Sequence, residues 1–468
     1  MVVFALALAW WVPRAFARTF TLPPCPACAS LRRAAPFLFA AAVLCGDLAA
    51  DYFGSFGFAD RADETLSRAV GLVSGPFYGV FGRPGQDAIV IVALDSDFVE
   101  RSGGAWPPPY KATQEVVEQI LAAQPKAVFL DSYYAQPRRT PVGWPDMEGA
   151  GALAKVSAGA RAAGVPILTG PVAKDQPALA PIAAAVDQVG LRSPDERPFA
   201  YSLYDGEQRP MAAVELYRIW KGGAAGAPAP LPPGNLSLDW GFGASAWMGE
   251  RLAEGDKACV APTLPARIKG ALALIWRSLT PNLTPESATA RGLLVDCPYF
   301  DIVPAAWLAD PVVRARLRDR VVLVGSTVPW LRDQAPTPLL GEVPGVMAHA
   351  MALDNLIQNG VWATRYPKAH KHIGNLDNGD FVQAGLLAGG FLMIWRLRRY
   401  TGLVRGESLP FELKLRVWAI IAAVGVSLSF IFCWPLFKLL IAAAAGGIAV
   451  EAWETLQDHK HRQEEAEA

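Results

Sequence analysis

The part of the chain that most restricts its fold is a strand, a helix and a second strand in close succession. Residues 88–94 form a continuous apolar run, typical of a parallel strand covered on both faces, although periodicity alone also fits a short buried helix. Residues 113–123 place apolar side chains at helical spacing, and residues 127–130 form a second apolar run. The runs end at Asp95 and Asp131. We therefore predict a right-handed βαβ unit with both acids at the carboxyl edge of a parallel sheet, where open α/β sheets bind ligands.

Further segments continue this alternation of strands and helices. The pattern predicts a helix over 149–163, a third strand over 165–170, another helix over 211–220 and a buried strand over 320–325. Residues 344–359 place apolar side chains on one face of a strong helix. Together these segments predict an α/β domain built on a mostly parallel, doubly wound sheet.

Apolar residues outside this domain gather in stretches that predict membrane helices. Only 18% of the residues are charged and the mean hydropathy is +0.23, which is too apolar for an ordinary soluble chain. A membrane helix needs about 20 mostly apolar residues. We predict an α-helical membrane part of about four spans, at 34–54, 381–397, 417–433 and 435–452.

Basic residues predict which segments face the cytoplasm. Arg32 and Arg33 precede the first span, and the loop 398–416 is rich in Arg and Lys. The positive-inside rule therefore places these segments, together with the charged tail 453–468, in the cytoplasm. The domain 55–380 then lies on the other side, in the periplasm of a bacterial inner-membrane, multi-pass protein.

The segment 1–33 is predicted to be cytoplasmic, and its first twelve residues suit an interfacial amphipathic helix in contact with membrane lipid. Cys25 and Cys28 form a Cys-Pro-Ala-Cys motif. The motif suits a redox or metal site, but no second ligand pair at zinc spacing accompanies it, and two idle thiols beside a membrane are the alternative. We therefore expect no metal.

The other cysteines agree with this topology. Cys259 and Cys297 are the two cysteines of the predicted periplasmic domain, and in an oxidising compartment we expect them to form a disulfide. The alternative is two unpaired buried thiols. Cys45 and Cys433 fall within predicted spans, where they are most simply apolar filler.

Charge and motifs restrict the function. The 43 Lys and Arg residues equal the 43 Asp and Glu residues, so bulk charge gives no argument for a nucleic-acid partner. The chain has neither a G-x-S-x-G nor an H-E-x-x-H motif. We therefore expect no enzymatic activity and no cofactor.

Two stretches carry a resemblance to a known family. The first is IVIVALDSDFVERSGGAWPPPYKATQEVVEQILAAQPKAVFLDSYYAQP, and the second contains VGST, then APTPL, then PGV-x-x-HA-x-x-LDNL. In order and spacing they resemble the second type of CHASE domain, an extracytoplasmic sensory domain of bacterial cyclases and histidine kinases. CPYFDIVPAAWL, from Cys297, also resembles a segment of that family. The resemblance covers about 47–362 and implies signal reception outside the cell.

The chain departs from the family pattern at two places. After the first strand the family commonly has Asp-Ile-Asp-Glu, whereas this chain has Asp95-Ser96-Asp97. Family members also commonly carry a cytoplasmic kinase or cyclase module, and the residues after the fourth predicted span are too few for one. The expectation is a sensory domain without its own output module.

Several polar side chains are expected to meet at the carboxyl edge of the sheet. Carboxylates, hydroxyls and one imidazole suit a divalent cation or a polar ligand. The alternative is structural, because an Asp after a strand often caps the next helix, and a lone His on a helix is usually satisfied locally. The candidate ligand or cation residues are Asp95, Asp97, Asp131, Ser326, Thr327 and His349.

These observations favour a receptor that senses in the periplasm and acts through its spans on a separate membrane or cytoplasmic protein. The alternative is a structural or assembly subunit that uses the sensory fold as a docking platform in a larger membrane complex. Both require a partner protein, and both leave the oligomeric state open, including a homo-oligomer.

Overall fold

The computed structural model describes residues 75–366 with gaps, the helix α16 (Phe411–Phe432) with the two residues after it, and scattered residues between 378 and 396. The longer gaps are 194–198, 224–229, 254–262 and 280–297. The chain divides into two compact units, and the elements described below belong to the unit Glu64–Tyr366.

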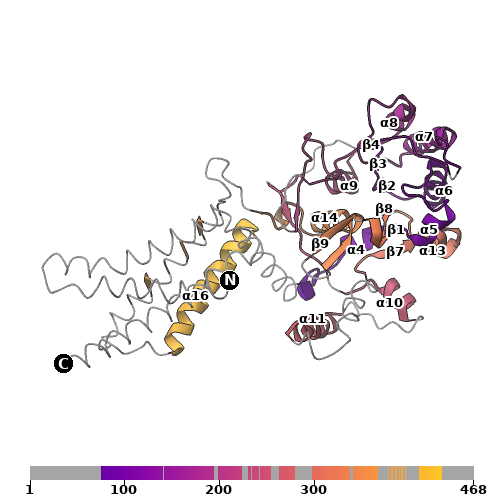
Figure 1. Cartoon of the computed structure of the whole chain (residues 1–468). Coiled ribbons are helices and arrows are strands. Elements are labelled where there is room, and N and C mark those ends of the chain that lie inside the picture. The colour runs from indigo at the N-terminus through magenta and orange to yellow at the C-terminus, as the bar shows by residue number, and fades with distance from the viewer. Residues whose placement is uncertain are drawn as a thin grey trace, which may run out of the picture. The chain divides into compact units, whose positions relative to one another are not determined.

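The centre of this unit is a six-stranded sheet in which every pairing is parallel (Figure 1). The strand order is β4-β3-β2-β8-β1-β7. The strands are β1 (Ile89–Leu94), β2 (Ala127–Leu130), β3 (Ile167–Thr169), β4 (Asp187–Gln188), β7 (Asp301–Pro304) and β8 (Val321–Ser326). The predicted α/β domain with a mostly parallel sheet is therefore confirmed.

The predicted βαβ unit is present, but its two strands are not neighbours. β8 lies between β1 and β2, so that Leu323 pairs with Ile91 on one side and with Phe129 on the other. The predicted helix begins at Tyr110, earlier than the expected Thr113, because Pro109 takes the N-cap position (α6, Tyr110–Leu121). The arrangement brings the carboxyl ends of three central strands side by side.

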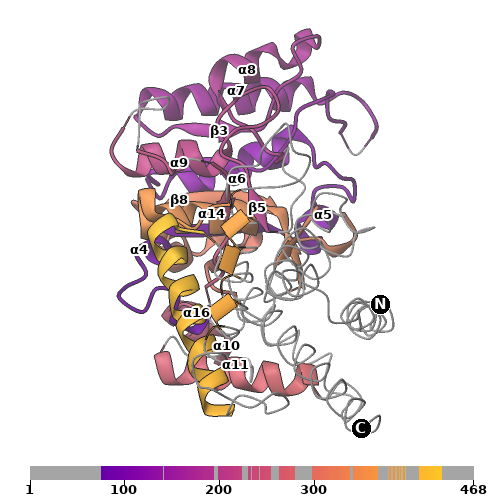
Figure 2. The ribbon, with the colours of Figure 1, turned by 90° about the vertical axis from the view of Figure 1, so that its left-hand side faces the viewer.

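Helices cover both faces of the sheet because successive strand residues alternate between two apolar cores. Ile89 and Ile91 belong to the core shared with α9 and α14, whereas Val90 and Val92 belong to the core shared with the other helices. The first face carries α9 (Ala212–Trp220) and α14 (Gly345–Asn359). The second carries α5 (Ser96–Arg101), α6, α7 (Met147–Ala162), α8 (Ala180–Ala185) and α13 (Pro311–Ala315). Figure 2 shows α7 and α8 lying along one another on that second face.

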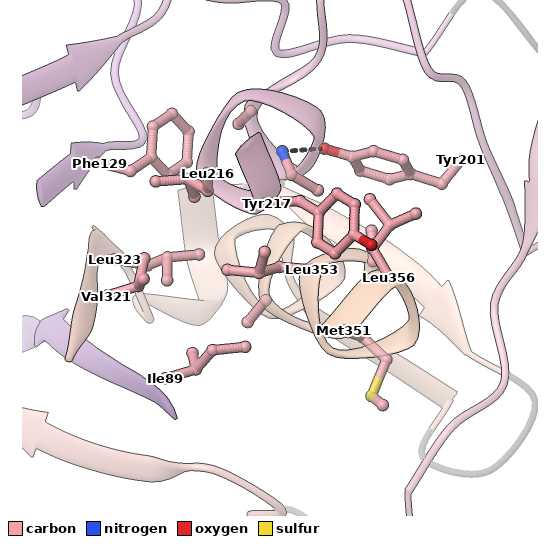
Figure 3. Packing of buried hydrophobic residues seen from close by; sticks show 14 of the residues in the cluster. Ile89, Phe129, Tyr201, Leu216, Tyr217, Val321, Leu323, Met351, Leu353 and Leu356 are labelled. Atoms are coloured by element: carbon pink, nitrogen blue, oxygen red, sulfur yellow. Dashed lines mark hydrogen bonds between the residues drawn. The ribbon is translucent and has the colours of Figure 1, made fainter. Parts of the chain in front are cut away.

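The closing helix α14 is buried almost all round. Leu353 and Leu356 pack towards Ile89, Val321 and Leu323 of the sheet and towards α9 (Figure 3). Its polar residues are buried as well, with Asp354 and Asn355 both 0% exposed. A polar side chain on this helix must therefore find its partner within the protein.

Shorter elements complete the unit. The ribbon β9 (Gln334–Thr337) and β10 (Gly341–Pro344) is antiparallel, as is the pair β5 (Ala200–Tyr201) and β6 (Leu236–Ser237). The helix α4 (Pro84–Ala88) leads into β1, and α11 (Leu264–Leu279) and the single turn η2 (Gly75–Phe77) contact one another.

The predicted membrane part stays a prediction. No helix in the described part of the chain has the length and hydropathy that a membrane span needs. The predicted spans 34–54 and 435–452, the segment 1–33 and the tail lie outside the described residues, as do Cys25, Cys28, Cys259 and Cys297. Cys433 is described and forms no disulfide.

Candidate functional site

The site lies at the carboxyl edge of the three central strands. The amide of Asp131, just past β2, donates to the Val324 carbonyl at 2.8 Å, and the amide of Thr327, just past β8, donates to the Leu94 carbonyl at 3.2 Å. The backbone hydrogen bonds between these strands thus continue one residue beyond the ends of β2 and β8. Asp131 and Thr327 are consequently held at the same edge, where α/β sheets place ligands.

Asp131 is a buried acid with an unsatisfied oxygen. Its side chain is only 9% exposed, and its Oδ2 has no hydrogen-bond partner among the described residues. Loss of hydration, together with a smaller effect of the nearby Asp333, raises the pKa of this carboxyl to about 8. Asp131 is therefore mostly protonated at neutral pH.

His349, on the second turn of α14, faces this carboxyl. Its Nε2 is 3.9 Å from Asp131 Oδ1, too far for a hydrogen bond. Burial lowers the pKa of the imidazole to about 4, so that both partners are neutral rather than an ion pair. The rings of Phe129 and Tyr201 pack edge-on against the imidazole at centroid distances of 5.3 and 5.6 Å.

Tyr201 fixes the tautomer of His349. The Tyr201 hydroxyl oxygen accepts from the amide of Ala213, in the first turn of α9, at 3.1 Å (Figure 3). The same hydroxyl is 2.8 Å from His349 Nδ1, and burial raises its pKa, so that it keeps its proton. The proton therefore points to Nδ1, and the neutral imidazole carries its own proton on Nε2, facing Asp131.

Asp333 approaches the same edge from the loop after β8. Its backbone carbonyl accepts from the amide of Gly345, the first residue of α14, at 3.0 Å. A Cβ on Gly345 would lie 2.6 Å from Asp333 Oδ1, so the side chain needs the glycine there. Asp333 is exposed, but partial loss of hydration still raises its pKa. The edge thus holds two carboxyls and a neutral imidazole.

The other predicted residues have local roles. Asp95 caps α5, accepting from the Phe98 amide at 2.9 Å, as the structural alternative expected. Asp97 is exposed in the first turn of the same helix. Ser326 Oγ accepts from the Val328 amide at 3.2 Å, and Thr327 is half-buried. The structure therefore groups Asp131 with His349, whereas Asp95 and Ser326 bond within their own turns.

The structure also adds two residues to the candidate site. Tyr201 and Asp333 belong to the site although the sequence analysis did not select them. Within the part of the chain that the structure describes, no group of three or more His, Cys, Asp or Glu side chains could hold a metal ion.

Comparison with known proteins gives one match. A sequence model of the CHASE2 domain family matches residues 72–376, which include every element of the sheet. Searches among curated proteins and solved structures find no match.

Proposed function

This chain belongs to the CHASE2 domain family, whose members are extracytoplasmic sensory domains, and we propose that it is an inner-membrane sensor. In this proposal the large domain lies in the periplasm, binds a polar ligand or a partner, and relays the change through membrane helices to a separate protein. The observation that carries the proposal is the row of buried polar groups from Asp131 through His349 and Tyr201 to the Ala213 amide.

This row supports sensing because it joins the sheet edge to two helices. His349 belongs to α14 and Ala213 to α9, so a ligand that bonds to Asp131 acts on both. A ligand shifts a protein only through different affinities for two arrangements. Repositioning of His349 against Tyr201 provides such a difference, since it alters the hydrogen bond at the start of α9.

The residues at the edge suit a small polar ligand with an apolar part. A protonated carboxyl and an Nε2–H donate hydrogen bonds, so they favour a carbonyl, carboxylate or phosphate oxygen on the ligand. Tyr133, two residues after Asp131, and Trp330, after β8, are 59% and 60% exposed. Aromatic surface near a few polar groups is the usual composition of a small-molecule site.

The relay would leave the domain through α14. This helix is followed by residues 360–380 and then by the predicted span 381–397. Insertion of Gly or Pro around 368–374 should uncouple the domain from the membrane and leave it folded. Unchanged signalling in such variants would contradict this route.

Ligand binding is tested directly on the purified full chain in mild detergent. We expect one member of a panel of amino acids, dicarboxylic acids, sugars and phosphate esters to raise the unfolding temperature, and Asp131→Asn to lose that rise. Asp97→Asn, the same change on the exposed turn of α5, is the matched control and should keep it. A rise that survives Asp131→Asn would remove the site from the proposal.

A second function, an assembly subunit, is favoured by large apolar side chains on the surface. Trp144 and Trp362 are 73% and 71% exposed, and Trp is enriched in protein–protein interfaces. Stoichiometric, salt-stable subunits that co-purify with the full chain would favour assembly, whereas an isolated homodimer would favour the receptor.

A further inference from the structure

A second buried polar cluster, away from the sheet edge, joins the incoming chain to the closing helix. The hydroxyl of Tyr78, three residues after the described part begins, donates to Asp354 Oδ2 at 2.7 Å. Asn355 Nδ2 donates to the Tyr78 hydroxyl oxygen at 3.2 Å. Asp354 and Asn355 are both on α14 and completely buried.

The same cluster extends to the outgoing chain. The Asp239 amide donates to Asn355 Oδ1 at 3.0 Å, and Asn355 Nδ2 donates back to the Asp239 carbonyl at 2.8 Å. Thr364, five residues past the end of α14, donates from Oγ1 to Asp239 Oδ2 at 2.6 Å. A continuous row of hydrogen bonds therefore links Tyr78 with Thr364, which lie at the two ends of the domain.

The packing around Asp354 is too close for a ligand. A Cβ on Gly85 of α4 would lie 1.9 Å from Asp354 Oδ1 and 2.9 Å from its Cα. That oxygen and the Tyr299 hydroxyl are both buried, and neither has a regular hydrogen-bond partner among the described residues. The cluster thus has a mechanical role and does not resemble the more accessible Asp131 site.

The surroundings of Asp354 disfavour its charged form. Loss of hydration raises the pKa of this carboxyl to about 7, although Tyr78, Tyr299 and the Arg83 guanidinium act in the opposite direction. Arg83 is occupied elsewhere, since it donates to the Gly243 carbonyl at 3.2 Å and lies over the Tyr299 ring. The titratable and charged groups that face the cluster, directly or through Arg83, are Tyr78, Arg83, Asp87, Asp239, Arg267 and Tyr299.

We propose that the segments around Tyr78 and Thr364 are held together by a clasp, which consists of Tyr78, Asp239, Asp354, Asn355 and Thr364. The clasp opens when the buried Asp354 carboxyl loses its proton and becomes charged. The clasp regulates how far the two ends of the domain move independently. It does not depend on the sensory role proposed above, and its test needs no ligand.

The sign of the pH effect follows from linkage. A carboxyl whose pKa is higher in the closed state than in the open state holds the clasp closed at low pH and less so as the pH rises towards 7. The equilibrium constant for opening of the clasp should increase by at most about tenfold for each pH unit, because opening releases at most one proton. Above about pH 7 the effect should level off, because the closed state then loses the same proton.

The test is hydrogen–deuterium exchange of the full chain in mild detergent at pH 5, 6, 7 and 8, corrected for the intrinsic pH dependence of exchange. We expect the segments 75–83 and 354–366 to exchange faster together as the pH rises. Asp354→Asn still accepts from Tyr78 but cannot ionise, so the pH dependence of exchange in these segments should become weaker; the remainder would come from Asp239, whose pKa burial also raises. Tyr78→Phe loses the central bond and should exchange faster at every pH.

Asp97→Asn is the matched control, because it makes the same change on the exposed first turn of α5 and should leave the pH dependence of both segments intact. The clasp would be overturned by exchange that is independent of pH in the wild type, by pH dependence that Asp354→Asn leaves unchanged, or by two segments that open separately. If Asp354→Asn fails to fold, Tyr78→Phe still decides, since a clasp predicts faster exchange in both segments and a purely local bond predicts it only in 75–83.

Discussion

Two buried acids beside α14 show opposite uses of the same kind of group. Asp354 is completely buried and accepts a 2.7 Å hydrogen bond from Tyr78, with α4 packed directly against it. Asp131 keeps 9% of its side chain exposed, its Oδ2 has no described partner, and its Oδ1 is 3.9 Å from His349. Both carboxyls have a raised pKa, about 7 for Asp354 and about 8 for Asp131.

This difference is the basis for proposing Asp131, and not Asp354, as the acid that binds a ligand. A buried polar group without a hydrogen bond costs about 1–3 kcal/mol, so a protein that retains one needs a reason. At Asp354 part of this cost is offset by Tyr78. At Asp131 no hydrogen bond from the described residues offsets this cost. A bound polar ligand would therefore supply the hydrogen bond that the carboxyl lacks in the folded domain.

The largest expected effect concerns packing against Asp354. Gly85→Ala places a methyl group against both the carboxyl and the backbone of Asp354, so we expect a loss of about 3 kcal/mol in the free energy of unfolding. Denaturant titration of the full chain measures it. Gly151→Ala, on α7 with open space around it, is the control and should be neutral or slightly stabilising. Equal effects at the two glycines would mean that α4 does not pack closely on Asp354.

The next effect is the pH dependence of stability. Both acids have a raised pKa in the folded state, so stability should fall as the pH rises, through about 7 for Asp354 and about 8 for Asp131. Between pH 6.5 and 8 we expect a loss of about 2 kcal/mol, most of it from Asp131. Asp131→Asn should remove most of this loss and Asp354→Asn the smaller part, as measured by unfolding at each pH.

The contribution of His349 to stability has the opposite pH dependence. Its pKa is lowered to about 4, so the stability that it contributes is present above its unfolded pKa of about 6.5 and is lost as the pH falls towards 4. Between pH 4 and 6.5 the two acids lower the stability more steeply than His349 raises it, so we expect these three groups together to make stability fall as the pH rises from about 4 to 8. A stability that rises steadily from pH 6 to 8 would contradict the burial of neutral acids.

A smaller effect is expected at Tyr201. Tyr201→Phe leaves His349 Nδ1 and the Ala213 amide without their shared partner, so we expect a loss of about 2 kcal/mol. Tyr204→Phe is a suitable control, since that side chain is 39% exposed. A change below about 0.5 kcal/mol for Tyr201→Phe would mean that the Tyr201 hydroxyl does not bridge His349 and α9.

The smallest effects are expected at the other two acids of the edge. Asp95→Ala removes the cap of α5 and should cost about 1 kcal/mol. Asp97→Asn changes an exposed residue and should alter stability by less than about 0.5 kcal/mol. If Asp97→Asn instead abolished ligand-induced stabilisation, the site would extend over α5, and the separation of Asp131 from the other acids would be wrong.

The sequence predicted the central strands because they are buried on both faces, which leaves an uninterrupted apolar run. β7 escaped prediction because its Asp-Ile-Val-Pro sequence is short and begins with an acid. The Oδ2 atom of this acid, Asp301, accepts from Arg316 and Arg320 at 2.9 and 2.8 Å. The position of β8 between β1 and β2 could not be predicted, because the order of strands along the chain does not determine their order in the sheet.

The site was predictable only where a residue follows a strand or belongs to a motif. Asp131 and His349 were found on these grounds. Tyr201 and Asp333 lie on segments without periodic pattern, so nothing in the sequence placed them at the edge. Asp354 was passed over because α14 was treated as amphipathic, whereas the helix is buried almost all round and the side chains of Asp354 and Asn355 bond within the protein.

The central claim is that Asp131 is a protonated, unsatisfied acid in the folded domain. Infrared difference spectroscopy of the full chain, wild type minus Asp131→Asn at pH 6, measures it directly. The account predicts the C=O stretch of a protonated carboxylic acid without a strong hydrogen bond, which persists when Asp354→Asn is also present and loses half of its intensity near pH 8. A carboxylate signal at pH 6 would contradict the account.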